Sequence, residues 1–427
     1  MEMTIETNVR LRRRRYVFVR VADQPVLDIG RFLKGEIAFQ TETECVLLCP
    51  VRGTSLRLSV EELGLMVNVP SDRWLTPDEV RAMRPELLNR VLDLAGRGIL
   101  LCDPAPDGLD GIAEAEEVME QMQWFDLAAL HHGQSRWRGV DGNLPVDASP
   151  SGKSLEERNK TRGDVPGHFV QRDDALARTA LQVPSLDGPF FEILLGRRTT
   201  RAWRCDQCLP KPALEKVLYA VFGAQGIKHL AGNVALIKRT SPSAGALHPI
   251  DAYVLVTNVE GVAPGLYHYE TATHALALLE RMDRGEAYDV ARLFTAGQSY
   301  FAEAHVLLVH VARLDRMFCK YARHSKAYKT VLMDSGHLSQ TMYLTAAHLG
   351  LGAFYTAAIN DADIESRLRL GPIREAAIAI SGFGIPTNGR DELAFDPDPY
   401  LPIWAAEAGH PSPRNSTELK GNEDGPQ

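Results

Sequence analysis

Two short stretches carry residue types that suit an anionic cofactor. Residues 197–203 read RRTTRAW and place three arginines and two hydroxyl side chains within five positions. Guanidinium groups donate paired hydrogen bonds that match a phosphate, and hydroxyls add further donors. Residues 241–256 read SPSAGALHPIDAYVLV, a loop of small residues that leads directly into an apolar run. Small side chains let a backbone approach a large flat ligand and leave its N–H groups able to donate.

Each stretch also has a simpler interpretation. The loop alone is equally compatible with an ordinary turn before a strand. His248, at its end, either caps that strand by a hydrogen bond or contacts a cofactor or substrate. Cys205 and Cys208 form a CxxC pair, but a pair without a second one is a weak metal or redox signal. We expect no metal site, and Rossmann, P-loop, HExxH and GxSxG motifs are absent from the sequence.

Composition sets the class of protein. The 427 residues are 45% hydrophobic and carry a net charge of −8, which predicts two or three globular domains and argues against binding to nucleic acid or an anionic membrane. Six cysteines in a chain without a secretory signal predict reduced thiols and a cytoplasmic location. The four arginines at positions 12–15 are more typical of a solvated edge or a flexible arm than of a binding site.

The first part of the chain predicts a small separate domain over residues 1–130. Short strands are expected at 16–21, 44–48 and 56–58, and helices between 76 and 96. Helices followed by a short hairpin indicate a winged-helix-like α/β unit. Because acidic residues balance the arginines of this helical region, we expect it to bind a peptide or protein partner rather than DNA. Residues 131–189 predict a connecting segment with one short helix near 171–181.

The rest of the chain alternates helix and strand patterns and predicts an α+β domain over residues 190–407. Helices are expected at 189–195, 211–222 and 329–350. Strands are expected at 250–256, 265–270, 274–280, 304–312 and 376–381. Residues 408–427 are polar and predicted to be disordered.

Five motifs of this half resemble a known family. RRTTRAW is similar to the RRSxRxF signature of the nitroreductase superfamily. SPSAGALHPIDAYVLV resembles a signature of its azoline-dehydrogenase branch, the SagB-type dehydrogenases and the cyanobactin and microcin thiazoline oxidases. GLYHYE, MDSGHLSQTMYLTAAHLGLGAFY and SGFGIP follow in the branch's order, with departures at Thr199, Thr271 and the pair Thr341 and Met342. The resemblance covers about residues 190–405 and extends to the subgroup of peptide maturation dehydrogenases.

The resemblance implies a central, mostly antiparallel sheet flanked by helices, and FMN bound non-covalently at the interface of a homodimer. It implies that Lys320 and Tyr321 handle a proton during oxidation, although both residues could merely decorate a surface helix. The positions that align with cofactor-binding residues of the family are Arg197, Arg198, Thr199, Arg201, Pro242, Ser243, Ala244, Gly245, Ala246, His248, Gln340, Gly350, Leu351 and Gly352.

The function that the resemblance implies is peptide maturation. An FMN-dependent dehydrogenase of this type oxidises thiazoline or oxazoline rings of a ribosomally synthesised peptide to thiazole or oxazole, and would work beside a cyclodehydratase. Two alternatives stay open. The same flavin could reduce dehydroamino acids, nitroaromatics or quinones with NAD(P)H, or the chain could be an inactive module that recruits a peptide or DNA.

Overall fold

A computed structural model describes residues 9–142, 172–182, 184–229, 235–371 and 373–387. The expected tail at 408–427 and the end of the expected domain at 388–407 lie outside the described residues. The helices and strands before residue 140 are β1 (Arg10–Arg13), β2 (Phe18–Leu27), α1 (Ile29–Phe32), β3 (Phe39–Cys49), η1 (Val51–Gly53), β4 (Thr54–Leu58), α2 (Val60–Val67), α3 (Pro77–Arg81), α4 (Pro85–Gly96), β5 (Leu100–Asp103), α5 (Ile112–Met122) and α6 (Asp126–Gln134).

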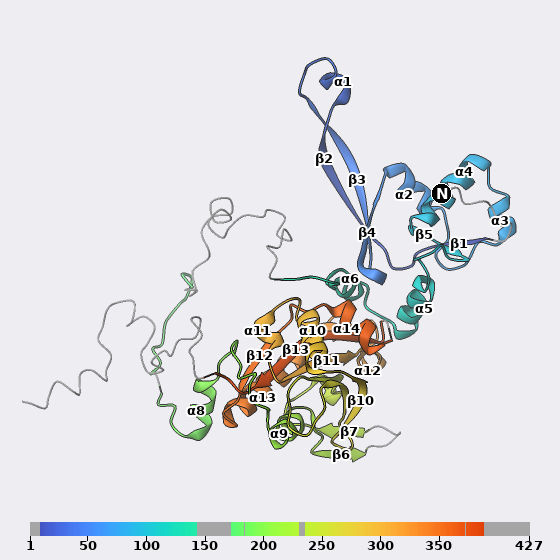
Figure 1. Cartoon of the computed structure of the whole chain (residues 1–427). Helices are drawn as coiled ribbons and strands as arrows, with labels where there is room; N and C mark the ends of the chain where they lie inside the picture. The colour runs from blue at the N-terminus through green and yellow to red at the C-terminus, as the bar shows by residue number, and fades with distance from the viewer. Residues whose placement is uncertain (1–8, 143–171, 183, 230–234, 372, 388–427) are drawn as a thin grey trace, which may run out of the picture.

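The N-terminal part contains the expected strands and helices in a different arrangement. Strand β5, which follows the helices, pairs with β1 instead of forming a hairpin of its own. The hairpin comes before the helices, where β2, β3 and β4 form a three-stranded antiparallel sheet. Its β2–β3 end extends away from the rest of the chain with α1 at its tip (Figure 1). The assignment as a winged-helix-like domain stays a prediction.

Two of the four arginines at positions 12–15 are buried, so the expectation of a solvated edge was wrong for these two. Arg12 and Arg14 are 1% and 3% exposed. Arg12 Nη2 lies 3.2 Å from Glu116 Oε2 on α5, and the Arg15 backbone N–H donates to the same oxygen at 3.1 Å. A buried cation needs such a partner. Since Glu116 lies 104 residues away from Arg12 in sequence, the local run of charge could not reveal it.

Helices α5 and α6 pack with the C-terminal half. Met119 and Trp124 belong to the same hydrophobic cluster as Val331 of the later half, and the expected boundary at residue 130 falls inside α6. The short helix expected near 171–181 is not formed over the described residues 172–182. Leu176 and Leu181 are exposed there, so a helix would have no apolar face to bury.

The C-terminal half confirms the expected α+β fold. Its elements are α8 (Pro189–Gly196), α9 (Lys211–Phe222), β6 (Gly226–His229), β7 (Ala235–Lys238), η2 (Ala244–Ala246), β8 (Ile250–Val256), β9 (Gly265–Glu270), β10 (Ala275–Arg281), α10 (Arg284–Phe294), α11 (Ser299–Ala302), β11 (Val306–Arg313), α12 (Leu314–Lys320), α13 (Ala327–His348), β12 (Gly352–Thr356), α14 (Asp361–Leu368) and β13 (Glu375–Gly384).

A six-stranded antiparallel sheet lies at the centre of this half, in the order β10-β9-β8-β11-β13-β12. Successive residues of the fully buried strand β11 point to opposite faces. Leu308 packs in a cluster with α9 and α13, whereas Leu307 and Val309 pack in a cluster with α10 and α14. Helices thus cover both faces. Among the described residues, no helix is long and apolar enough to cross a membrane.

Candidate functional site

The small-residue loop is folded into an unusual backbone conformation between β7 and β8. Gly245 has φ 61°, Ala246 has φ 55° and His248 has φ 46°. Glycine adopts this left-handed region readily, but residues with a Cβ do so at a cost of about 1–3 kcal/mol. The loop therefore needs contacts that hold it, and such strain is concentrated at functional sites.

The strongest of these contacts come from Asp334 on α13. The Ser243 hydroxyl donates to Asp334 Oδ2 at 2.6 Å, and the Ala244 backbone N–H donates to Oδ1 at 3.2 Å. Ser243 Oγ in turn accepts from the His248 backbone N–H at 2.9 Å. Asp334 is 4% exposed, so its carboxylate is held inside the fold by donors from the loop. It ties the loop to the long helix.

Sequence reasoning missed Asp334, although a signal was present. It lies on the buried face of α13, between Val331 and Leu338, where a carboxylate is rare unless it has a partner. Ser241 forms a second contact between the loop and α13, because its Oγ lies 2.6 Å from Thr341 Oγ1. Thr341, one of the departures from the family pattern, thus has a contact within this chain.

The Lys320 and Tyr321 pair lies against the loop. Lys320 Nζ donates to the Gly245 carbonyl at 3.3 Å. A Cβ at Gly245 would lie 2.5 Å from Tyr321 Oη and 2.8 Å from Lys320 Nζ, so a larger residue there would displace these two side chains. Lys320 is exposed and Tyr321 is half-buried. The structure brings together two segments that are 75 residues apart in the chain.

The arginine stretch is positioned by α13 and β12. The Arg197 guanidinium lies over the Tyr343 ring, 5.1 Å from its centroid, and Thr199 Oγ1 lies 3.0 Å from Tyr343 Oη. The Thr200 backbone N–H donates to the Ala353 carbonyl at 2.8 Å. A Cβ at Gly352 would overlap the Thr200 side chain. The expected residues 197–201 and 350–352 therefore lie side by side.

The other residues that the sequence analysis expects to bind the cofactor differ in their exposure. Pro242, Arg198 and Gln340 are exposed, and Arg201 and Leu351 are half-buried. A contact of Gln340 with the cofactor stays a prediction. Gly350 has φ 68° just after α13 ends, so its role in ending the helix is clear without a ligand.

His248 bonds to the protein backbone. Its Nε2 lies 3.0 Å from the Ile237 carbonyl of β7. Burial, and next the nearby Arg239, lower the pKa of His248, so the neutral ring with its proton on Nε2 donates to that carbonyl. This is the capping interpretation of His248, and a contact with cofactor or substrate stays a prediction.

Sequence reasoning also missed His310, a second buried polar side chain in this region. His310 of β11 has its Nδ1 2.9 Å from Ser335 Oγ, which lies 3.1 Å from Tyr355 Oη. Burial lowers the pKa of His310 to about 3, so the ring is neutral. These three side chains link β11 and β12 to α13, the helix whose Asp334 holds the loop.

The two cysteines of the CxxC pair lie at the surface. Cys205 and Cys208 are both exposed thiols, and the Cys208 thiol lies 3.1 Å from Asn258 Oδ1. Within the described ranges, no group of three or more His, Cys, Asp or Glu side chains is arranged to hold an ion.

Comparison with known proteins places these segments in one family domain. The nitroreductase family model matches residues 194–385. The protein named as nitroreductase MJ1384 of Methanocaldococcus jannaschii is 29% identical over 191 residues, which are 44% of this chain and 89% of the relative. The trifolitoxin-processing protein TfxB of Rhizobium leguminosarum is 30% identical over 149 residues, which are 34% of this chain and only 38% of the relative.

Solved structures show weaker likeness. A chain of the Escherichia coli microcin synthetase McbBCD complex with truncated pro-MccB17 has a TM-score of 0.44 at 21% identity and covers 58% of this chain and 90% of that one. A nitroreductase from Desulfovibrio desulfuricans in complex with FMN has a TM-score of 0.33 at 18% identity, and the match covers 56% of this chain and 99% of that one. Likeness at this level says nothing about activity.

The expected arginine stretch, the small-residue loop and the Lys320 and Tyr321 pair all fall within the matched segment. Residues 194–385 of this chain therefore form a nitroreductase family domain.

Proposed function

We propose that this chain is an FMN-dependent oxidoreductase that acts in the maturation of a ribosomally synthesised peptide. Two comparisons support the proposal. The family of residues 194–385 favours a flavin-dependent oxidoreductase, and one relative of this chain is named as a trifolitoxin-processing protein.

The residues present fit FMN by the chemistry of their donors. Arg197, Thr199 and Arg201 offer guanidinium and hydroxyl groups within five positions, and all three are half-buried. This set suits a phosphate that is partly accessible to water. On the loop, Ser243 to Ala246 offer little side-chain bulk, which suits a flat ring system. Both segments are attached to α13.

Each group would then have a defined role. Arg197, Thr199 and Arg201 would hold the phosphate, and the loop would lie against the ring. The bound flavin would supply a two-electron acceptor. Lys320 and Tyr321 would take up and hold the proton that leaves the substrate's α-carbon, since Lys320 Nζ and Tyr321 Oη both lie against Gly245 of that loop.

The reaction we propose is the oxidation of thiazoline or oxazoline rings to thiazole or oxazole. The observation that carries this choice is the convergence of Lys320 and Tyr321 on Gly245. A dehydrogenation of this kind removes a hydride from one ring carbon and a proton from its neighbour, so it needs a proton acceptor beside the flavin-binding loop. A cytoplasmic homodimer that works beside a cyclodehydratase would suit this reaction.

A second candidate is a reductase that uses NAD(P)H. The relative MJ1384, named as a nitroreductase, aligns over 89% of its own length. Such an enzyme would run the flavin in the opposite direction and would need no proton acceptor for a peptide α-carbon.

One experiment separates the two candidates. The FMN-loaded protein is incubated with a synthetic peptide that contains a thiazoline, and the product is followed by mass spectrometry. We expect the peptide to lose two hydrogens per ring. A protein that leaves the peptide unchanged but oxidises NAD(P)H with a nitroaromatic or quinone would replace the first candidate by the second.

A further inference from the structure

A cavity of about 220 Å³ lies where the N-terminal part meets the nitroreductase domain. Its walls come from η1, from α5 and α6, and from Ile373 just before β13. Ala115, Met119 and Ala129 make the surface largely apolar. Pockets that hold drug-sized ligands measure about 300–1,000 Å³, so this cavity suits a single side chain.

Two strained backbone positions line the same cavity. Arg52 has φ 68° and Ile373 has φ 74°. A β-branched residue in this region is a genuine outlier, and strain of this kind is concentrated at ligand sites. The elements around the cavity are rigidly joined, because a Cβ at Gly53 or at Gly133 would overlap the backbone of the opposite element.

The buried side-chain atoms without a partner on the residues that line the cavity are donors. Trp124 Nε1 and Arg136 Nε are buried and find no acceptor among the described residues, and Trp124 is 2% exposed. His132 has its Nδ1 3.1 Å from Tyr328 Oη. Burial lowers the pKa of His132 to about 3 and raises the pKa of Tyr328. His132 and Tyr328 therefore share a hydrogen bond between a neutral imidazole ring and a neutral phenol.

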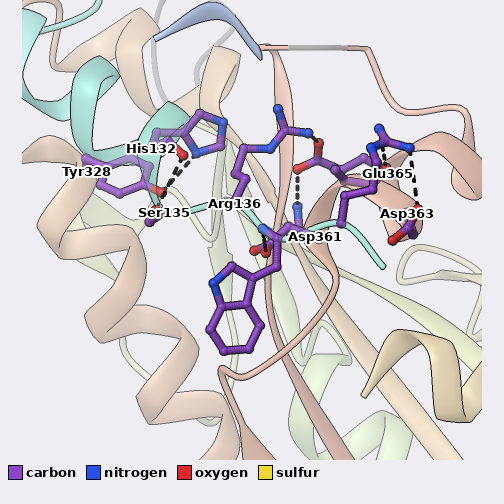
Figure 2. A network of polar contacts seen from close by, with 11 residues as sticks. His132, Ser135, Arg136, Tyr328, Asp361, Asp363 and Glu365 are labelled. Atoms are coloured by element: carbon purple, nitrogen blue, oxygen red, sulfur yellow. Dashed lines mark hydrogen bonds and ion pairs between the residues drawn. The ribbon is translucent and has the colours of Figure 1, made fainter. Parts of the chain in front are cut away.

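The charges around the cavity are largely compensated. Arg136 forms an ion pair with Glu365, and Asp361 accepts from the Trp137 backbone N–H at 3.0 Å (Figure 2). The guanidinium of Arg52 donates to the carbonyls of Gly108 and Asp110. A cavity with unpaired donors and little net charge favours a ligand that is neutral and accepts hydrogen bonds.

We infer that this cavity binds an apolar side chain of the peptide substrate, with a backbone carbonyl of that peptide accepting a hydrogen bond from Trp124 Nε1. The inference rests on the proposed function for the identity of the ligand as a peptide. The peptide would be anchored here, away from the ring that is oxidised.

The cavity is connected to the candidate proton acceptor. The Trp124 ring packs on Phe318 of α12, with 4.8 Å between the ring centroids, and α12 ends at Lys320. The Arg323 backbone N–H donates to the Gln123 carbonyl at 2.7 Å. A peptide side chain bound in the cavity would thus support α12, the helix that carries Lys320.

Ligand-observed NMR on the full-length protein tests the inference with small probes. N-acetyl-leucinamide and N-acetyl-phenylalaninamide are neutral, and each has an apolar side chain and amide carbonyls. N-acetyl-aspartamide, with its free side-chain carboxylate, is the charged comparison. Ala115→Leu fills the cavity, and Ala113→Leu adds the same bulk on the same helix at a residue that does not line it. Trp124→Phe keeps the ring packing and removes one donor.

We expect the wild type and Ala113→Leu to bind a neutral probe and Ala115→Leu to lose it. Trp124→Phe should bind three- to tenfold more weakly, since one hydrogen bond contributes about 0.5–1.5 kcal/mol. The inference is overturned if neither neutral probe binds the wild type, if Ala115→Leu binds as well as Ala113→Leu, or if the charged probe binds best.

Two controls keep the result decisive. Thermal unfolding shows whether Ala115→Leu folds, and Trp124→Phe decides the question if it does not. Probe binding requires neither flavin nor turnover. A protein that binds the neutral probes but never oxidises a thiazoline peptide would contradict the proposed function and leave the cavity assignment standing.

Discussion

Replacing Asp334 should loosen the loop that we propose to contact the flavin. Asp334 accepts from the Ser243 hydroxyl at 2.6 Å and from the Ala244 N–H at 3.2 Å. The same loop holds Ala246 and His248 at positive φ. With the carboxylate removed, these two residues can relax, and the loop loses the conformation that we propose for FMN binding.

The magnitude follows from these two bonds. A hydrogen bond to a charged group contributes about 1.5–3 kcal/mol. Because Ser243 and Ala244 are half-buried, water can replace part of this, and we expect Asp334→Ala to cost about 2 kcal/mol in FMN binding. That corresponds to a roughly 30-fold weaker dissociation constant. Asp334→Asn keeps the shape and one acceptor, so its loss should be smaller.

The assay is a double-mutant cycle with Asp334→Ala and Ser243→Ala. FMN affinity is measured by flavin fluorescence in the wild type, both single variants and the double variant. We expect a coupling energy of about 1.5 kcal/mol between Asp334 and Ser243. Wild-type FMN affinity in Asp334→Ala, or a coupling energy near zero in protein that folds normally, would refute the reasoning.

Three further variants test other parts of the site. Arg201→Ala should weaken FMN binding by one charge-assisted contact of about 1.5–3 kcal/mol, and equilibrium dialysis that finds unchanged flavin retention would count against a phosphate role. Lys320→Ala should keep the flavin but lose turnover on a thiazoline peptide, and a wild-type rate would remove Lys320 from the mechanism. Burial raises the pKa of Glu365 from 4.5 to about 7, so the contribution of this carboxyl to stability is present below about pH 4.5 and is lost as the pH rises through 7. The unfolding free energy of Glu365→Gln relative to wild type should therefore rise by up to about 3 kcal/mol between these limits, whereas a difference independent of pH would show that Glu365 titrates normally.

Local patterns predicted several elements of the C-terminal half closely, although α10, α12, β12 and α14 were not expected. The limits of α9 and β9 agree with those expected from the sequence, because Pro212 marks the start of one and an apolar run bounded by turn residues marks the other. Val331, Leu338 and Met342 recur at helical spacing and lie on the buried face of α13. These features depend on residues close together in sequence, which is why periodicity reveals them.

The features that the sequence did not reveal depend on distant partners. Asp334 is explained by donors about 90 residues away, and buried Arg12 by Glu116 at a separation of 104 residues. Neither partner lies within a local window. The helix expected near residue 175 is not formed, because its apolar residues have no distant segment to pack against among the described residues. Packing between distant segments decides such positions.

The content of bound flavin tests the central claim most directly. The full-length protein, purified without added cofactor or after incubation with FMN, should absorb in the flavin bands and release FMN on denaturation, at about one FMN per chain. Colourless protein that takes up no FMN would contradict both enzyme candidates and the assignment of residues 197–201 and 241–248 to a flavin site.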